Sequence, residues 1–142
     1  MNNSHRALVM VVVMATLSAC ASQESAGDAA DASGKVCISV RNINGFNPLS
    51  DRELLVTANV KDYYLFTVLG ICNNLRSANA IAVSDPTTRI CDDGFGKIAF
   101  RDIGRTRQVC RVDQIERVGS PEEAREIVEA REQARRDQRE QK

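Results

Sequence analysis

Five cysteines limit what this 142-residue chain can fold into more than any other feature of its sequence. Cys37, Cys72, Cys91 and Cys110 lie in one stretch that also holds every tyrosine and phenylalanine, whereas Cys20 lies ahead of that stretch. An even set of cysteines in so small a domain predicts two disulfides. Disulfides stabilise a small core by restricting the unfolded chain.

An apolar run explains why Cys20 stands apart from the other cysteines. Arg6 is followed by eleven residues, Ala7 to Leu17, of which only Thr16 is polar. This run is too short to span a bilayer. A positively charged start, an apolar run and small residues after it are the layout of a secretory signal peptide, so we predict that residues 1–19 are removed.

The residues at the end of the run add a lipid anchor to this prediction. Leu17-Ser18-Ala19-Cys20 resembles the lipobox of bacterial lipoproteins. The resemblance implies that Cys20 is acylated, with palmitate-type chains, and becomes the first residue of the mature protein; an ordinary cleavage site beside an incidental cysteine is the alternative. Ala21, rather than Asp, favours the outer membrane, where the acyl chains would hold the protein stably on the periplasmic side.

The remaining chain divides into three zones. Residues 20–34 are small, polar and acidic, which predicts a flexible tether. Residues 35–118 are predicted to form one β-rich, disulfide-stabilised domain, and residues 119–142 a charged tail that is helical or frayed. Basic and acidic residues are 19 each over the whole chain, so the net charge does not favour a nucleic-acid partner.

Strand signals recur through the central zone. Residues 36–40 alternate between apolar and other side chains, as a half-buried strand does. Residues 53–60 and 63–69 form a predicted hairpin around Lys61-Asp62, and residues 97–101 and 106–112 a second one. A helical turn within 73–79 precedes a short strand at 80–84, which Asp85-Pro86 ends.

These elements predict a mainly β fold. Six short strands and one short internal helix suggest a small antiparallel sheet, either a partly closed barrel or a sandwich, because curling protects the strand edges. Ile115 and Val118 are predicted to extend the last strand.

A helix start follows the domain. Ser120-Pro121-Glu122-Glu123 combines an N-cap, a proline at the first helical position and an acid at the third. Ala124, Ile127 and Val128 are predicted to dock one or two turns on the domain. Beyond Glu129 the residues are nearly all charged or Gln, so that part is predicted to project into solvent and fray.

The pairing of the four domain cysteines is open to three connectivities. We favour Cys37 with Cys110, which joins the opening strand to the closing one, and Cys72 with Cys91, which staples the loop around the short helix. Side-chain parity weakens the first pair, because Cys37 alternates with the apolar positions of its strand. Zinc is not expected, because the cysteines are separated by 34, 18 and 18 residues and form no close pair.

Catalysis is not expected either. The only histidine, His5, lies in the predicted signal peptide, so no histidine base remains for a serine or cysteine nucleophile. An acid–base pair of carboxylates, as in glycosidases, is the alternative, but a domain of this size leaves little room for a substrate cleft. The candidates are Asp51, Glu53, Asp62, Asp92 and Asp93. Asp92-Asp93-Gly94 is better explained as a turn, and no cofactor or metal is predicted.

Four arginines of the second hairpin form a candidate anion patch: Arg101, Arg105, Arg107 and Arg111. Their ligand would be a phosphate or an anionic glycan. A solvated strand face is the alternative, because surface arginines are common.

A series of short motifs, weak singly but specific in order and spacing, runs through the domain: Cys37-Ile38, Asn44-Gly45-Phe46, Leu49-Ser50-Asp51-Arg52, Tyr64-Leu65, Cys72-Asn73-Asn74-Leu75, Arg89-Ile90-Cys91 and Cys110-Arg111-Val112. With this series the chain resembles a family of small Gram-negative bacterial lipoproteins that carry a cysteine-bearing domain of unknown function. The resemblance covers residues 35–118, leaves the tether and tail outside, and implies a secreted β-rich domain without a known activity.

Two functions are therefore expected. The first is an outer-membrane-anchored, non-enzymatic module that contacts another envelope protein or has a structural role. The alternative is a periplasmic module that binds a small ligand or an anion.

Overall fold

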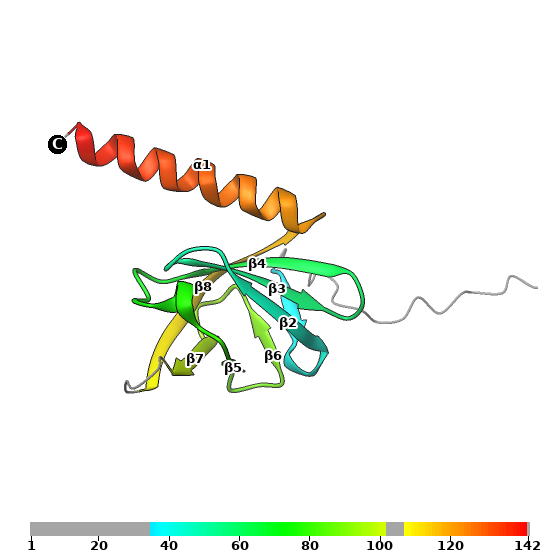
Figure 1. Ribbon diagram of the computed structural model, residues 1–142. Helices are drawn as coiled ribbons and strands as arrows, with labels where there is room; N and C mark the ends of the chain where they lie inside the picture. Colours follow the sequence, from blue (N-terminus) through cyan, green and yellow to red (C-terminus); the bar gives the residue numbers. More distant parts are fainter. Residues whose placement is uncertain (1–34, 102–106, 142) are drawn as a thin grey trace, which may run out of the picture.

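The computed structural model describes residues 35–101 and 107–141. Strands dominate, and one α-helix follows them (Figure 1). In chain order the elements are β1 (Cys37–Ser39), the 3-10 turn η1 (Val40–Asn42), β2 (Ile43–Pro48), β3 (Glu53–Ala58), β4 (Asp62–Val68), the 3-10 turn η2 (Leu75–Ser77), β5 (Ile81–Ser84), β6 (Arg89–Cys91), β7 (Lys97–Arg101), β8 (Arg107–Val118) and α1 (Pro121–Glu140).

Six of the strands form one antiparallel sheet in the order β2-β3-β4-β8-β7-β5. The sheet curls into a half-barrel, and β1 pairs with β6 in a separate two-stranded ribbon. The predicted class, a mainly β fold with a small, partly closed antiparallel sheet, is confirmed.

Strand β8 holds the two halves of the sheet together. Its first part, residues 107–111, pairs with β7, and residues 112–118 pair with β4 across a register shift at Val68. Both predicted hairpins, β3–β4 and β7–β8, are present, and the extension of the last strand to Val118 is confirmed. The predicted turn between β7 and β8 lies outside the described residues.

Two strands escaped prediction. In β2 the register shifts between Ile43 and Gly45, and this irregularity breaks the alternation that identifies a strand. In β6 only three residues pair, and their partner β1 lies more than 50 positions earlier in the chain. Short, non-local pairing of this kind leaves little trace in a local pattern.

Both faces of the β3–β4 hairpin are buried. Leu54, Val56 and Phe66 face the main core inside the half-barrel, whereas Leu55 and Leu65 face outward and pack against α1. Strands buried on both faces carry consecutive apolar residues instead of an alternating pattern. This explains the runs Leu54–Val56 and Tyr64–Phe66.

Helix α1 lies across the outer face of the sheet (Figure 1). The Ser120 hydroxyl accepts a hydrogen bond from the Glu123 N–H at 3.2 Å, which confirms the predicted cap. Ala124 and Val128 are buried against the sheet, as predicted. The prediction of fraying beyond Glu129 is wrong: the helix continues to Glu140, because arginines of its second half form ion pairs with the sheet.

Candidate functional site

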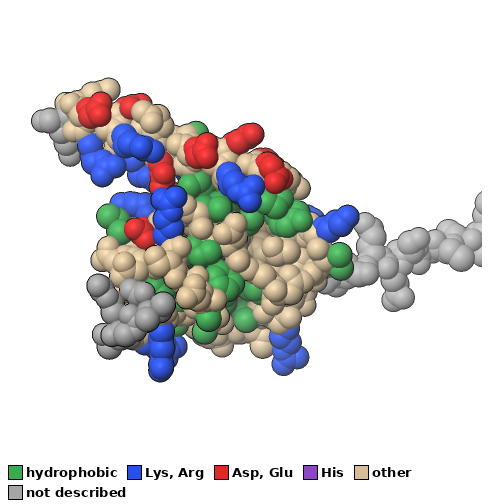
Figure 2. Space-filling model, viewed as in Figure 1, with side chains coloured by type: hydrophobic (Ala, Val, Ile, Leu, Met, Phe, Trp, Pro, Cys, Tyr) green, Lys and Arg blue, Asp and Glu red, His purple; other side chains and the backbone are tan. Residues whose placement is uncertain are grey.

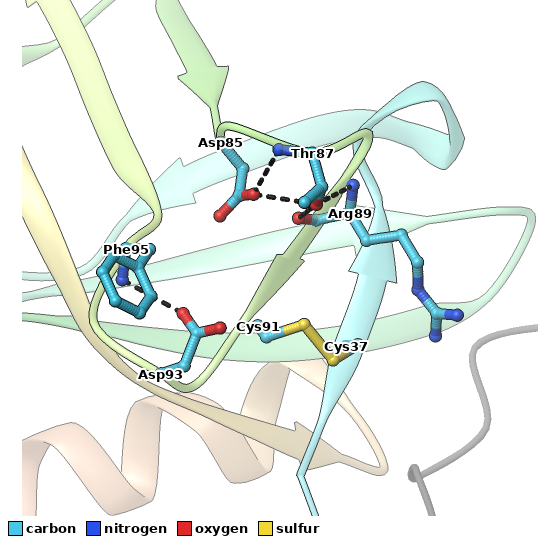
Figure 3. Close-up of a disulfide and its surroundings, with 7 residues drawn as sticks. All are labelled: Cys37, Asp85, Thr87, Arg89, Cys91, Asp93 and Phe95. Carbon is cyan, nitrogen blue, oxygen red and sulfur yellow. Dashed lines mark hydrogen bonds between the residues drawn. A yellow bond between two sulfur atoms is a disulfide. The ribbon is translucent and has the colours of Figure 1, made fainter.

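The two disulfides differ from the predicted pairs. Cys37 is bonded to Cys91, with 4.1 Å between their Cα atoms, and Cys72 to Cys110, with 6.0 Å between theirs. The prediction of Cys37 with Cys110 and of Cys72 with Cys91 was wrong because it lacked β6, which places Cys91 directly opposite Cys37 in the ribbon (Figure 3). Cys110, on the inner face of β8, therefore bonds to Cys72, which lies in the segment before η2.

The turn into β6 is fixed by a compact hydrogen-bond pattern. The Asp85 carboxylate accepts bonds from the N–H and the hydroxyl of Thr87, and that hydroxyl in turn contacts the backbone of Arg89 (Figure 3). The bonds direct the chain from β5 back along β1. In the strand that follows this turn, Cys91 is in register with Cys37.

The five candidate carboxylates do not meet in one cleft. Glu53 and Asp62 lie at opposite ends of the β3–β4 hairpin, and Asp62 pairs there with Arg117 at 2.7 Å. Asp92 and Asp93 belong to the β6–β7 turn. Asp51 accepts a bond from the backbone N–H of Arg76 at 3.3 Å. The arrangement gives no acid–base pair at a shared site among these residues.

Glu53 is the most buried charge among the described residues. Its carboxylate has no exposed surface and accepts bonds from Arg135 of α1, at 2.8 and 3.3 Å, and from the hydroxyl of Ser50. Ser50 is itself buried and accepts bonds from the N–H groups of Arg52 and Glu53 at 3.0 Å each. Sequence reasoning missed this network because Arg135 lies 82 residues after Glu53 in the chain. Its role is to fasten the helix to the sheet.

The predicted turn at Asp92-Asp93-Gly94 is confirmed. The Phe95 N–H donates to the Asp93 carboxylate at 3.0 Å, and Gly94 has a positive φ of 77°. The Gly94 carbonyl accepts two bonds from the Arg111 guanidinium, at 3.0 and 2.8 Å. Arg111 is therefore engaged in holding this turn.

The arginine patch is only partly assembled as predicted. Arg101 and Arg107 are direct cross-strand neighbours on β7 and β8, and both are exposed. Arg111 is turned toward Gly94, and Arg105 lies outside the described residues. Sequence reasoning missed Lys97, which lies opposite Arg111. The hairpin register was the available signal: if Arg101 pairs with Arg107, then counting four residues outward along each strand pairs Lys97 with Arg111.

A shallow pocket of about 390 Å³ lies beside the arginine pair. Its lining residues come from the segment before β5, from β5 itself and from the ends of β7 and β8: Asn79, Ala80, Ile81, Ala82, Ala99, Phe100, Arg101 and Arg107. The lining is mainly apolar, and the two arginines supply its charge. The hollow exists because alanines occupy the cross-strand positions 82 and 99.

A larger groove of about 840 Å³ runs between α1 and the sheet. Pro48 and Leu49 border it from the sheet, Arg76 from η2, and Arg125 and Arg136 from the helix. Basic side chains gather between the C-terminal half of α1 and the domain (Figure 2). The groove is open and strongly polar, which suits a protein surface better than a small apolar ligand.

Residues 35–101 and 107–141 hold no group of three or more His, Cys, Asp or Glu side chains placed to bind a metal ion. Within the same ranges no helix has an apolar stretch long enough to cross a bilayer.

Comparison with known proteins identifies a family and no activity. Neither the curated proteins nor the solved structures gave a match. A protein-family model, described as a family of unknown function (DUF6491), matches residues 3–142. The match therefore includes the N-terminal segment and α1, so the expectation that the family resemblance stops at residues 35 and 118 was wrong. The chain belongs to this family of unknown function.

Proposed function

We propose that the protein is a lipid-anchored, non-enzymatic lipoprotein of the bacterial outer membrane, whose β-domain contacts another component of the envelope. The observation that carries the proposal is the pairing of all four domain cysteines with one another. Two disulfides suit an oxidising compartment such as the periplasm. They leave Cys20, at the end of the lipobox-like sequence, as the one cysteine that the domain does not use.

The anchor is tested by metabolic labelling with a clickable palmitate analogue. We expect label on the wild-type protein and none on Cys20→Ala. Ser18→Thr, which keeps the cysteine and a small polar neighbour, serves as the expression control. Equal labelling of wild type and Cys20→Ala refutes the anchor.

The groove between α1 and the sheet supports the interaction role. Such a charged, open surface resembles the polar part of a protein interface. A photo-crosslinking residue at Ala130, which borders the groove, should capture an envelope protein in living cells. The same residue at Val60, which is 85% exposed in the β3–β4 turn, is the matched control. Capture at neither position, or equal capture at both, contradicts a specific interaction through this groove.

A further inference from the structure

The β7–β8 hairpin places two like charges directly opposite each other. Arg101 and Arg107 are cross-strand partners, and directly opposed like charges destabilise a strand pair. In the paired segments 97–101 and 107–111 there is no acidic residue to offset them. Neither arginine forms an ion pair with a described residue, unlike Arg117, Arg131 or Arg135 elsewhere in the domain.

The second like-charged pair on this face, Lys97 with Arg111, is different. Arg111 gives two hydrogen bonds to the Gly94 carbonyl, which turns its guanidinium toward the β6–β7 turn. Its charge therefore has a structural use. Arg101 and Arg107 have no such use among the described contacts, and both border the pocket of about 390 Å³.

The pocket complements the arginine pair. Its volume falls within the range of about 300–1,000 Å³ that small-molecule sites have. Ala82 and Ala99 are cross-strand partners beside it and leave an apolar floor. A ligand that fits must therefore combine a short apolar body with an anionic head.

We propose that this pocket binds a small amphiphilic phosphate. Its phosphate oxygens accept hydrogen bonds from the guanidiniums of Arg101 and Arg107, which are suited to bidentate contacts with phosphate. Its apolar part lies on Ala82 and Ala99. The bound anion relieves the repulsion between the two arginines, so binding and stabilisation of the hairpin are coupled.

The test uses residues 20–142, which include every described residue, with Cys20→Ser to prevent acylation. n-Octyl phosphate, below its critical micelle concentration, is titrated by calorimetry and by amide NMR at low ionic strength. We expect it to bind at least tenfold more tightly than inorganic phosphate or n-octyl glucoside, with shifts centred on Ala82 and Ala99. Absence of binding, or shifts centred elsewhere, overturns the proposal.

Three variants locate the binding energy. Arg101→Gln and Arg107→Gln should each weaken n-octyl phosphate binding about tenfold, because each removes a charge-assisted contact. Arg89 is an exposed arginine on β6, away from the pocket, so Arg89→Gln is the matched control. This variant should bind n-octyl phosphate as tightly as the parent protein does. Equal affinity in all three variants overturns the proposal.

A fourth variant separates binding from folding. Arg107→Glu replaces the like-charged pair by an opposite pair, so we expect its melting temperature to rise while n-octyl phosphate binding is lost. A lower melting temperature would show that the pair is not under repulsion, and that outcome contradicts the argument.

Vesicles distinguish the source of the ligand. If the protein binds n-octyl phosphate and, in a separate assay, vesicles of phosphatidic acid in phosphatidylcholine, the site is assigned to a lipid headgroup. If it binds n-octyl phosphate but not the vesicles, the site is assigned to a free phosphate ester. Binding of vesicles alone overturns the pocket. None of these measurements depends on acylation of Cys20, so the site and the anchor can fail independently.

Discussion

Glu53 depends on a single distant residue for its charge partner. Its carboxylate is fully buried, and Arg135, whose side chain is 31% exposed, supplies two of its hydrogen bonds. Removing one partner of a buried pair leaves the other charge uncompensated. We expect Arg135→Ala to lower the free energy of unfolding by about 2–3 kcal/mol, below the usual cost for a fully buried pair because Arg135 is partly exposed. Urea denaturation measures this change.

Two controls qualify this prediction. Arg136→Ala removes the next arginine, which is 59% exposed and lies 3.7 Å from Glu132, and it should cost less than about 0.5 kcal/mol. The double variant Glu53→Leu with Arg135→Met should recover most of the lost stability, since apolar residues replace a buried pair well. A double variant as unstable as Arg135→Ala would show that charge burial is not the cause.

Glu122 gives the helix start a dependence on pH. Its pKa is lowered from the ordinary value of 4.5, chiefly by a hydrogen bond from the backbone, with smaller contributions from Ser120 and Arg125. A lowered pKa means that the folded state favours the charged form, so this stabilisation is present above pH 4.5 and is lost as the pH falls through the lowered pKa. An NMR titration of the Glu122 carboxyl should show a midpoint below 4.5. A midpoint at or above 4.5 contradicts the prediction.

At the scale of elements, the disulfides join strands and turns that are far apart in the sequence. Cys72 and Cys110 close a separation of 38 residues. In the chain-entropy model, replacing both by serine lowers the free energy of unfolding by about 4 kcal/mol. Calorimetry measures the loss. The variant lacking Cys37 and Cys91, with a separation of 54, should lose a similar amount.

Non-reducing peptide mapping checks the connectivity directly. We expect one linked peptide pair that contains Cys37 with Cys91 and another that contains Cys72 with Cys110. A peptide that links Cys37 to Cys110 would contradict the structure and restore the pairing favoured by sequence reasoning.

The elements that sequence reasoning identified are those with local signals. The hairpins β3–β4 and β7–β8 have alternating or apolar runs around a turn, and α1 has a cap with proline. It missed β2, in which the register shifts, and β6, which is only three residues long. The pairing of β4 with β8 is equally non-local, and no local pattern encodes it.

The candidate site, like the fold, was predictable only where its residues are close together in the sequence. Arg101 and Arg107 were identified because they flank one turn, and hairpin register brings such residues together. The pocket beside them was not predictable, because Ala82 comes from β5 and reaches the site only through sheet order. The Glu53–Arg135 pair requires the path of α1 over the sheet, which depends on packing.

At the scale of the whole molecule, α1 completes the domain. It covers the outward-facing apolar residues Leu55, Leu65 and Val118. A chain that ends at Ser120 should expose them, bind the dye ANS and self-associate in size-exclusion chromatography, because exposed apolar patches drive association. A chain that ends at Glu132 keeps the apolar contacts of Ala124 and Val128, so it should elute as the full chain does but with reduced stability. Equal stability of the full chain and the chain ending at Ser120 would contradict this role.

The position of the first disulfide has a mechanical consequence. Cys37 opens β1 and lies two residues after Lys35, where the described chain begins. A force applied from the N-terminal side therefore reaches the covalent bond to Cys91 before it can peel β1 from β6. The load passes into the middle of the chain, past the short ribbon whose hydrogen bonds would otherwise break first. In single-molecule pulling from the N-terminus, the oxidised domain should resist this first peeling step, and a reductant should make it appear as an early extension.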